Sequence, residues 1–197
     1  MIKSAALAVL AAAAIPALAG DLQTITIDFD DQAGGLPPVV TDGQFSEHAT
    51  FSTEDNHVLL IFAGAGFVDG SPPNTLTAAE TPTSSIYDSD IYIDFTTAVQ
   101  NLTMDVLSDN DSGVIGAINV FHAGGSSTID VIGNGDFADG IAMDLSSYID
   151  VTRVELVNIT DEFGLAIDNL VFDAPVPTPG TLALLTMAGF TASRRRR

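Results

Sequence analysis

The sequence predicts an all-β domain in which two antiparallel sheets pack face to face. Apolar and polar residues alternate in short segments, and glycine, asparagine, aspartate and proline separate these segments. No stretch of ten or more residues repeats its apolar residues with the 3.6-residue period of a helix. Nine or ten such segments occur in about 150 residues, a density typical of a two-sheet β-sandwich.

Each predicted strand directs alternate apolar side chains into the space between the sheets. The alternation is clearest in residues 24–30, 91–95 and 102–106. Residues 66–85 contain three prolines and are predicted to form a long loop, either an ordered excursion or a mobile flap. The other predicted strands are residues 58–63, 117–122, 128–132, 141–145, 154–158 and 165–172.

The last predicted strand breaks its own alternation. If Leu165 and Ile167 face the core, strict alternation turns Leu170 and Phe172 outward. One extra residue at positions 168–169 returns both apolar pairs to the core. The sequence therefore predicts a β-bulge at that point.

The charge of the chain excludes several classes of partner. It has 26 acidic and 6 basic residues, and Arg153 is the only lysine or arginine between Asp21 and Asp173. Such a surface repels phosphate backbones and anionic lipid headgroups, so no nucleic-acid partner is expected. Because the chain has no cysteine, it can form neither disulfides nor thiolate metal sites.

Residues 1–19 have the pattern of a secretory signal peptide. Lys3 precedes an apolar run, and Ala17-Leu18-Ala19 supplies the small residues that signal peptidase requires before Gly20. The run is shorter than the roughly 20 residues of a membrane span. The expected mature domain is residues 20–173.

Residues 174–197 form a tail with three parts in a fixed order. Pro177 and Pro179 come first, an uncharged apolar stretch at 182–190 follows, and the chain ends on Arg194, Arg195, Arg196 and Arg197. An apolar segment followed by cations stops in a membrane with the cations on the cytoplasmic side. A segment this short also fits an interfacial helix.

This order of parts resembles the PEP-CTERM sorting signal of bacterial exported proteins. The resemblance implies that an exosortase-like enzyme processes the tail and passes the protein to the cell surface or extracellular matrix. Before processing, the short C-terminal apolar helix would anchor the protein in the inner membrane. The glutamate usual between the two prolines is Thr178 here. A plain tail anchor is the alternative interpretation.

The middle of the chain resembles the jelly-roll domains, similar to galactose-binding-like modules, of many such proteins. Residues 71–76, 91–95 and 164–170 carry this resemblance. It implies a structural Ca²⁺ that joins the first and last strands, held by Asp28 or Asp30 on one side and Asp168 on the other.

Calcium also suits the composition, because Ca²⁺ binds hard oxygen ligands and the chain is rich in aspartate. Residues 109–113 place Asp109 and Asp111 at alternate positions before Gly113, like the start of a calcium loop without its downstream glutamate. A hairpin turn selects the same residues. Solvent-facing positions on strands are the alternative for Asp28, Asp30 and Asp168.

No catalytic pattern stands out, since the chain has neither a Gly-x-Ser-x-Gly nor a His-Glu-x-x-His motif. The sequence therefore favours a non-enzymatic structural or adhesive protein at the cell surface. The alternative is a module that binds extracellular polysaccharide, with Tyr92 as an outward aromatic platform. Cross-strand packing is the other interpretation of Tyr92, and a secreted hydrolase has no motif behind it.

Overall fold

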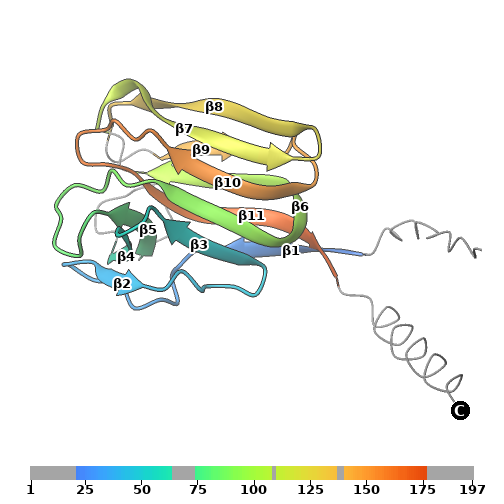
Figure 1. The fold of residues 1–197 in the computed structure, drawn as a ribbon, viewed down its shortest axis with the longest axis horizontal. Coiled ribbons are helices and arrows are strands. Elements are labelled where there is room, and N and C mark those ends of the chain that lie inside the picture. The colour runs from blue at the N-terminus through green and yellow to red at the C-terminus, as the bar shows by residue number, and fades with distance from the viewer. Residues whose placement is uncertain (1–20, 64–73, 108–109, 137–139, 177–197) are drawn as a thin grey trace, which may run out of the picture. The chain divides into compact units, whose positions relative to one another are not determined.

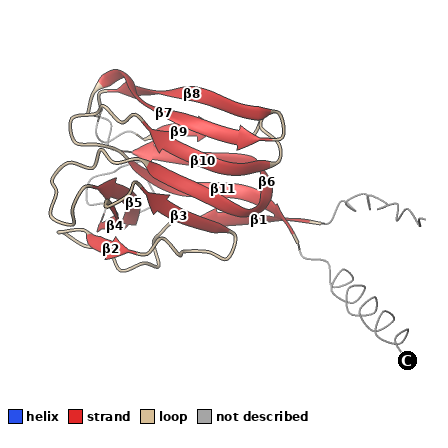
Figure 2. Ribbon diagram, viewed as in Figure 1, coloured by secondary structure: helices blue, strands red, loops and turns tan. Residues whose placement is uncertain are grey.

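The computed structural model describes residues 21–63, 74–107, 110–136 and 140–176, and every regular element among them is a β-strand (Figure 2). The predicted signal peptide lies outside the described residues, and so does the predicted sorting tail from residue 177 onward; the first residues assigned to that tail, 174 and 175, are the end of strand β11. The described residues contain no helix long and apolar enough to cross a membrane. The strands are β1 (Leu22–Ile27), β2 (Val39–Thr41), β3 (Ala49–Thr53), β4 (Val58–Ala63), β5 (Asn74–Ala79), β6 (Ile91–Leu107), β7 (Ser112–His122), β8 (Gly125–Asn134), β9 (Ile141–Asp144), β10 (Val151–Val157) and β11 (Ala166–Pro175).

The strands form two antiparallel sheets that share the long strand β6. Strands β3, β6, β10, β7 and β8 pair in that order, and they follow one another across the view in Figure 1. The later part of β6 pairs with β11 and β9 in the second sheet, which also contains β1, β2, β4 and β5. Asn101 has a φ of 54° within β6, just after the point where the strand passes from the first sheet, through Val99, to the second, through Gln100.

One hydrophobic core lies between the sheets and draws side chains from both. The ring of Phe95 on β6 meets the ring of Phe172 on β11 edge to face, with 5.0 Å between the ring centroids. Phe29, just after β1, meets Phe51 of β3 in the same way at 5.6 Å. Edge-to-face aromatic pairs add to the burial of apolar surface, and these two join the layers.

The all-β prediction is confirmed, but three details of it are wrong. Residues 91–95 and 102–106, predicted as separate strands, are parts of the single strand β6. Residues 66–85, predicted as a loop, include β5, all of whose residues are buried. Because both faces of β5 are covered, its threonines are buried, and the strand has no solvent-exposed polar face that an alternating pattern could reveal. Strands β2 and β3 were also missed, since β2 has only three residues and β3 has one large apolar side chain, Phe51, so neither shows an alternating pattern.

The predicted bulge on β11 is confirmed, and it lies at a junction of strands. Along one edge, β11 pairs first with β5 through Ala166 and Ile167 and then with β1 from Leu170 onward. Along the other edge, the register with β6 shifts between Asp168 and Val171. The bulge therefore falls where β5 gives way to β1.

Candidate functional site

The side chain of Asn74 joins the start of β5 to the turn that follows β1. Its Nδ2 donates to the carbonyl oxygen of Gln32 at 2.9 Å, with longer contacts to those of Phe29 and Asp30 at 3.4 and 3.5 Å. The backbone N–H of Asn74 donates to Asp30 Oδ1 at 3.3 Å. Asn74 is buried, so these bonds occupy polar groups that water does not reach.

Two buried polar side chains lie beside this junction. The β5–β11 register pairs Leu76 with Ile167, so Thr75 and Asp168 are the next residues along their strands, on the face opposite the core. Asp168 is 0 % exposed and Thr75 is 2 % exposed. Asp168 Oδ1 accepts a hydrogen bond from Asn169 N at 2.7 Å, whereas Thr75 Oγ1 has no partner among the described residues. A buried hydroxyl without a partner is costly, and an oxygen ligand site would use it.

The structure brings some of the predicted calcium ligands toward one place. Asp28 and Asp30 follow β1, and Asp168 lies in the bulge of β11, the strand with which β1 pairs. Across residues 21–63, 74–107, 110–136 and 140–176, however, no group of three or more His, Asp or Glu side chains could hold a metal ion by itself. Calcium at this junction would need other oxygen donors, such as Thr75 Oγ1, and it stays a prediction.

Of the second predicted pair of calcium ligands, Asp109 and Asp111, the described residue Asp111 has a structural role. Asp109 lies outside the described residues. Asp111 Oδ2 accepts a hydrogen bond from the backbone of Glu162, and the backbone N–H of Asp111 donates to Asp161 Oδ2. Asp161 is 3 % exposed and also accepts hydrogen bonds from the backbones of Asn110 and Phe163. Sequence reasoning missed Asp161, because aspartate in a turn is common and its partners lie far along the chain.

The outward face of the first sheet carries a connected polar network. Arg153 on β10 lies at its centre: Nη1 is 2.9 Å from both carboxylate oxygens of Asp94, and Nε donates to Glu155 Oε1 at 2.7 Å. Asn119 Nδ2 donates to Glu155 Oε2, and Thr128 Oγ1 donates to Asn119 Oδ1. The network therefore crosses β6, β10, β7 and β8.

Tyr92 stands on the same face, as predicted, because its neighbours Ile91 and Ile93 are buried in the core. The guanidinium carbon of Arg153 lies 4.9 Å from the centroid of the Tyr92 ring, a cation–π contact. The phenol donates to Asp90 Oδ2 at 3.3 Å. Tyr92 therefore packs within the network, and whether it contacts a glycan stays a prediction.

The pKa values of groups on this face are shifted by burial and by the several carboxylates that lie close to the single guanidinium of Arg153. Burial lowers the pKa of the Arg153 guanidinium, but its hydrogen bonds to Glu155 and Asp94 outweigh this effect and the pKa is raised. Burial raises the pKa of the Asp90 carboxyl, and the charge of Glu54 raises it further. Burial, followed by the charge of Asp90, also raises the pKa of the Tyr92 phenol.

Comparisons with known proteins give structural likenesses at low identity. Neither a protein-family model nor a curated protein matches the chain. The K1 cleaved adhesin domain of Lys-gingipain from Porphyromonas gingivalis aligns at 14% identity and a TM-score of 0.47, covering 79% of this chain and 99% of that domain. The K2 cleaved adhesin domain of Lys-gingipain gives 14% identity and 0.46, with coverages of 76% and 97%. An exo-beta-agarase gives 14% identity and 0.40, with coverages of 69% and 24%. These values do not identify a function.

The Asn74 junction makes a stability prediction. Replacing Asn74 with alanine removes the donor to the turn carbonyls and should lower the free energy of unfolding by about 1–3 kcal/mol, because buried acceptors lose their partner. Urea denaturation measures this loss. Gln23→Ala, an exposed amide on β1, is the matched control and should change it by less than about 0.5 kcal/mol. Equal effects of the two substitutions would contradict the assigned role of Asn74.

The raised pKa of Asp90 makes a pH prediction. The folded state holds this proton more tightly than the unfolded state does. The protonated carboxyl therefore contributes fully to the stability of the fold below the ordinary pKa of 3.8, and this contribution is lost as the pH rises through the raised pKa. Asp90→Asn should therefore raise the melting temperature at about pH 7, with a gain that shrinks as the pH falls toward about 3.5. Melting curves across this range measure the difference. The exposed Asp88→Asn makes the same change of charge, and an identical profile for it would count against the burial of Asp90 as the cause.

Proposed function

We propose that this chain is an exported, non-enzymatic adhesive or structural protein of the bacterial cell surface or extracellular matrix. The observation that carries the proposal is the outward face of β6, β10, β7 and β8, where one hydrogen-bonded network joins four strands. Side chains on paired strands are held in register by the backbone, so they suit a fixed contact surface. Adhesion needs such a surface and needs no reaction.

The address of the protein is part of the same proposal. Residues 1–19 would be removed by signal peptidase, and the tail at 174–197 would be recognised through Pro177, Pro179 and the terminal arginines by an exosortase-like enzyme. The sandwich would belong to the jelly-roll, galactose-binding-like modules found with such tails. Its acidic surface suits a salty exterior, since high charge keeps a protein soluble.

A second candidate function is the binding of extracellular polysaccharide. Tyr92 and Arg153 favour it, because an aromatic ring and a guanidinium lie together on an exposed sheet face. Aromatic rings and paired polar groups are the usual contacts of protein with sugar. This candidate has the same fold and the same cell-surface localisation as the first, so the two differ only in the ligand that the outward face binds.

Display at the surface tests the main proposal. In the native host, antibodies against the domain should label intact cells, and deletion of residues 177–197, which leaves β11 intact, should release the protein into the medium. Cells that lack the protein should attach less well to one another or to surfaces, and the full chain should restore attachment. Protein retained in the cytosol with both terminal segments uncleaved would overturn the proposal.

Calcium at the β1–β11 junction has its own test. At a free Ca²⁺ concentration 100 times the Kd, a single site adds about 2.7 kcal/mol of stability. For a chain of this size, the melting temperature of the secreted protein should then fall by about 5–10 °C in excess chelator. Asp168→Asn or Asp30→Asn should abolish the shift, whereas Asp130→Asn on the exposed strand β8 should keep it. An unchanged melting temperature in chelator would show that calcium has no structural role.

A further inference from the structure

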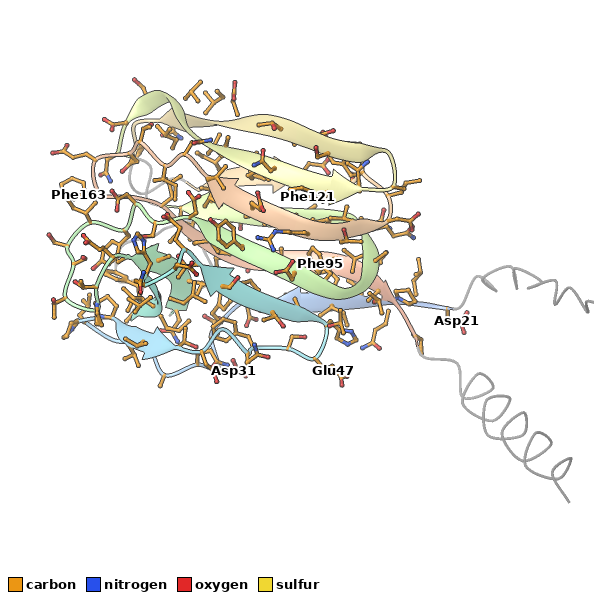
Figure 3. The ribbon with its side chains drawn as sticks, viewed as in Figure 1. Asp21, Asp31, Glu47, Phe95, Phe121 and Phe163 are labelled. Carbon is orange, nitrogen blue, oxygen red and sulfur yellow. The ribbon has the colours of Figure 1, made fainter. Side chains whose placement is uncertain are left out.

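The outward face of the first sheet places its polar and aromatic residues in two parallel rows. In one row, the register sets Tyr92 beside Glu155, Glu155 beside Asn119, and Asn119 beside Thr128. In the other, it sets Asp94 beside Arg153, Arg153 beside Phe121, and Phe121 beside Ser126. Figure 3 labels Phe121 near the middle of this face. The two rows form a broad surface that runs across the strands.

Arg153 has hydrogen-bonding capacity left over at the centre of these rows. Its Nε and Nη1 are used within the protein, whereas Nη2 has no hydrogen bond among the described residues. The side chain of Arg153 is 33% exposed and that of Asp94 is 48% exposed. Water or a ligand can therefore reach a donor and an acceptor that lie side by side.

A ligand for this face must accept a hydrogen bond from the guanidinium of Arg153 and donate one to the carboxylate of Asp94. Neighbouring hydroxyl groups of a sugar ring do both, because each hydroxyl is a donor and an acceptor. Phe121, half-buried opposite Arg153, offers an apolar surface to the C–H groups of the same ring. One aromatic ring with a few convergent polar groups is the usual composition of a small-ligand contact.

Charge narrows the class of ligand. Arg153 already faces the carboxylates of Asp94 and Glu155, and it is the only lysine or arginine among the described residues, so a polyanion would meet net repulsion. The carboxylates of Asp94 and Glu155 would attract a cationic peptide, but both are already paired with Arg153. A protein partner commonly buries an apolar centre, whereas hydroxyl, amide and charged groups surround Tyr92 and Phe121 on this face. An uncharged ligand rich in hydroxyls fits best.

We propose that the outward face of β6, β10 and β7 binds an uncharged polysaccharide. Arg153 Nη2 donates to ring hydroxyls, Asp94 accepts from them, and Phe121 packs against one sugar face. Tyr92 lies beneath the guanidinium and positions it. This inference rests on the proposed function, because it names what an adhesive face would hold.

Affinity electrophoresis of the secreted full chain tests the inference. The gels contain soluble glucan, galactan or mannan as uncharged probes, and alginate or a sulfated galactan as acidic ones. At least one uncharged polymer should retard the protein, with little change when salt is added, whereas the acidic polymers should not. Retardation by acidic polymers alone, with strong loss in salt, would overturn the inference.

Variants assign the contact to this face. Arg153→Met keeps the apolar stem and removes the donors, and Phe121→Ala removes the apolar surface; each should weaken binding about tenfold or more. Asp130→Asn changes an exposed residue of β8 outside the network and should leave binding unchanged. Because Arg153→Met leaves two carboxylates without their cation, its melting curve is measured as well. Asp94→Ala, which removes the acceptor and should also weaken binding, is the second variant if Arg153→Met unfolds. Unchanged binding in the folded variants would overturn the assignment.

The two levels of the proposal fail differently. If no uncharged polymer binds while the protein remains on the cell surface and supports attachment, the ligand class is wrong and the adhesive function stands. If uncharged polymers bind through Arg153 but the protein is neither exported nor needed for attachment, the ligand class stands and the adhesive function is wrong.

Discussion

The backbone of β11 must find hydrogen-bond partners along both of its edges, and the architecture of the second sheet follows from how they are filled. β6 pairs along one edge of β11. Along the other edge, β5 pairs with the first part of β11 and β1 with the rest. Two strands that meet along one edge leave backbone groups unpaired at the junction. At this junction the bulge at residues 168–169 shifts the register of β11 with β6, and the amide of Asn74 joins the start of β5 to the turn after β1.

Several carboxylates of this domain accept hydrogen bonds from its own backbone and side chains. Asp161 and Asp111 tie the β6–β7 connection to the segment between β10 and β11, and Asp173 accepts from the side chains of Thr24 and Asn101. Those two hydrogen bonds hold the pKa of Asp173 below its ordinary value. A count of acidic residues is therefore a poor guide to metal sites here, because turns and strand ends use them first.

Sequence patterns predicted the parts of the fold in which one face of a strand meets water. The alternation around Ile91 and Ile93 gave the strand and the outward direction of Tyr92, and the broken alternation around Ile167 and Leu170 gave the bulge. β5 escaped prediction because both of its faces are buried. The network around Arg153 was missed as well, although a lone cation among 26 acids is a signal in the sequence itself. Its partners are distant along the chain, so the register of the strands was needed to find them.

A contact surface built on strands has a thermodynamic consequence for adhesion. Arg153 is held by two carboxylates and an aromatic ring, so little side-chain freedom remains to be lost when a ligand binds. A few hydrogen bonds and one apolar contact still give only a weak single interaction. A polysaccharide repeats its unit many times, and a protein displayed on a surface presents many copies, so that weak contacts add through their high effective concentration. If the face binds polysaccharide as proposed, rigid and individually weak contacts of this kind would suit holding polymers to a cell surface better than capturing a free small molecule.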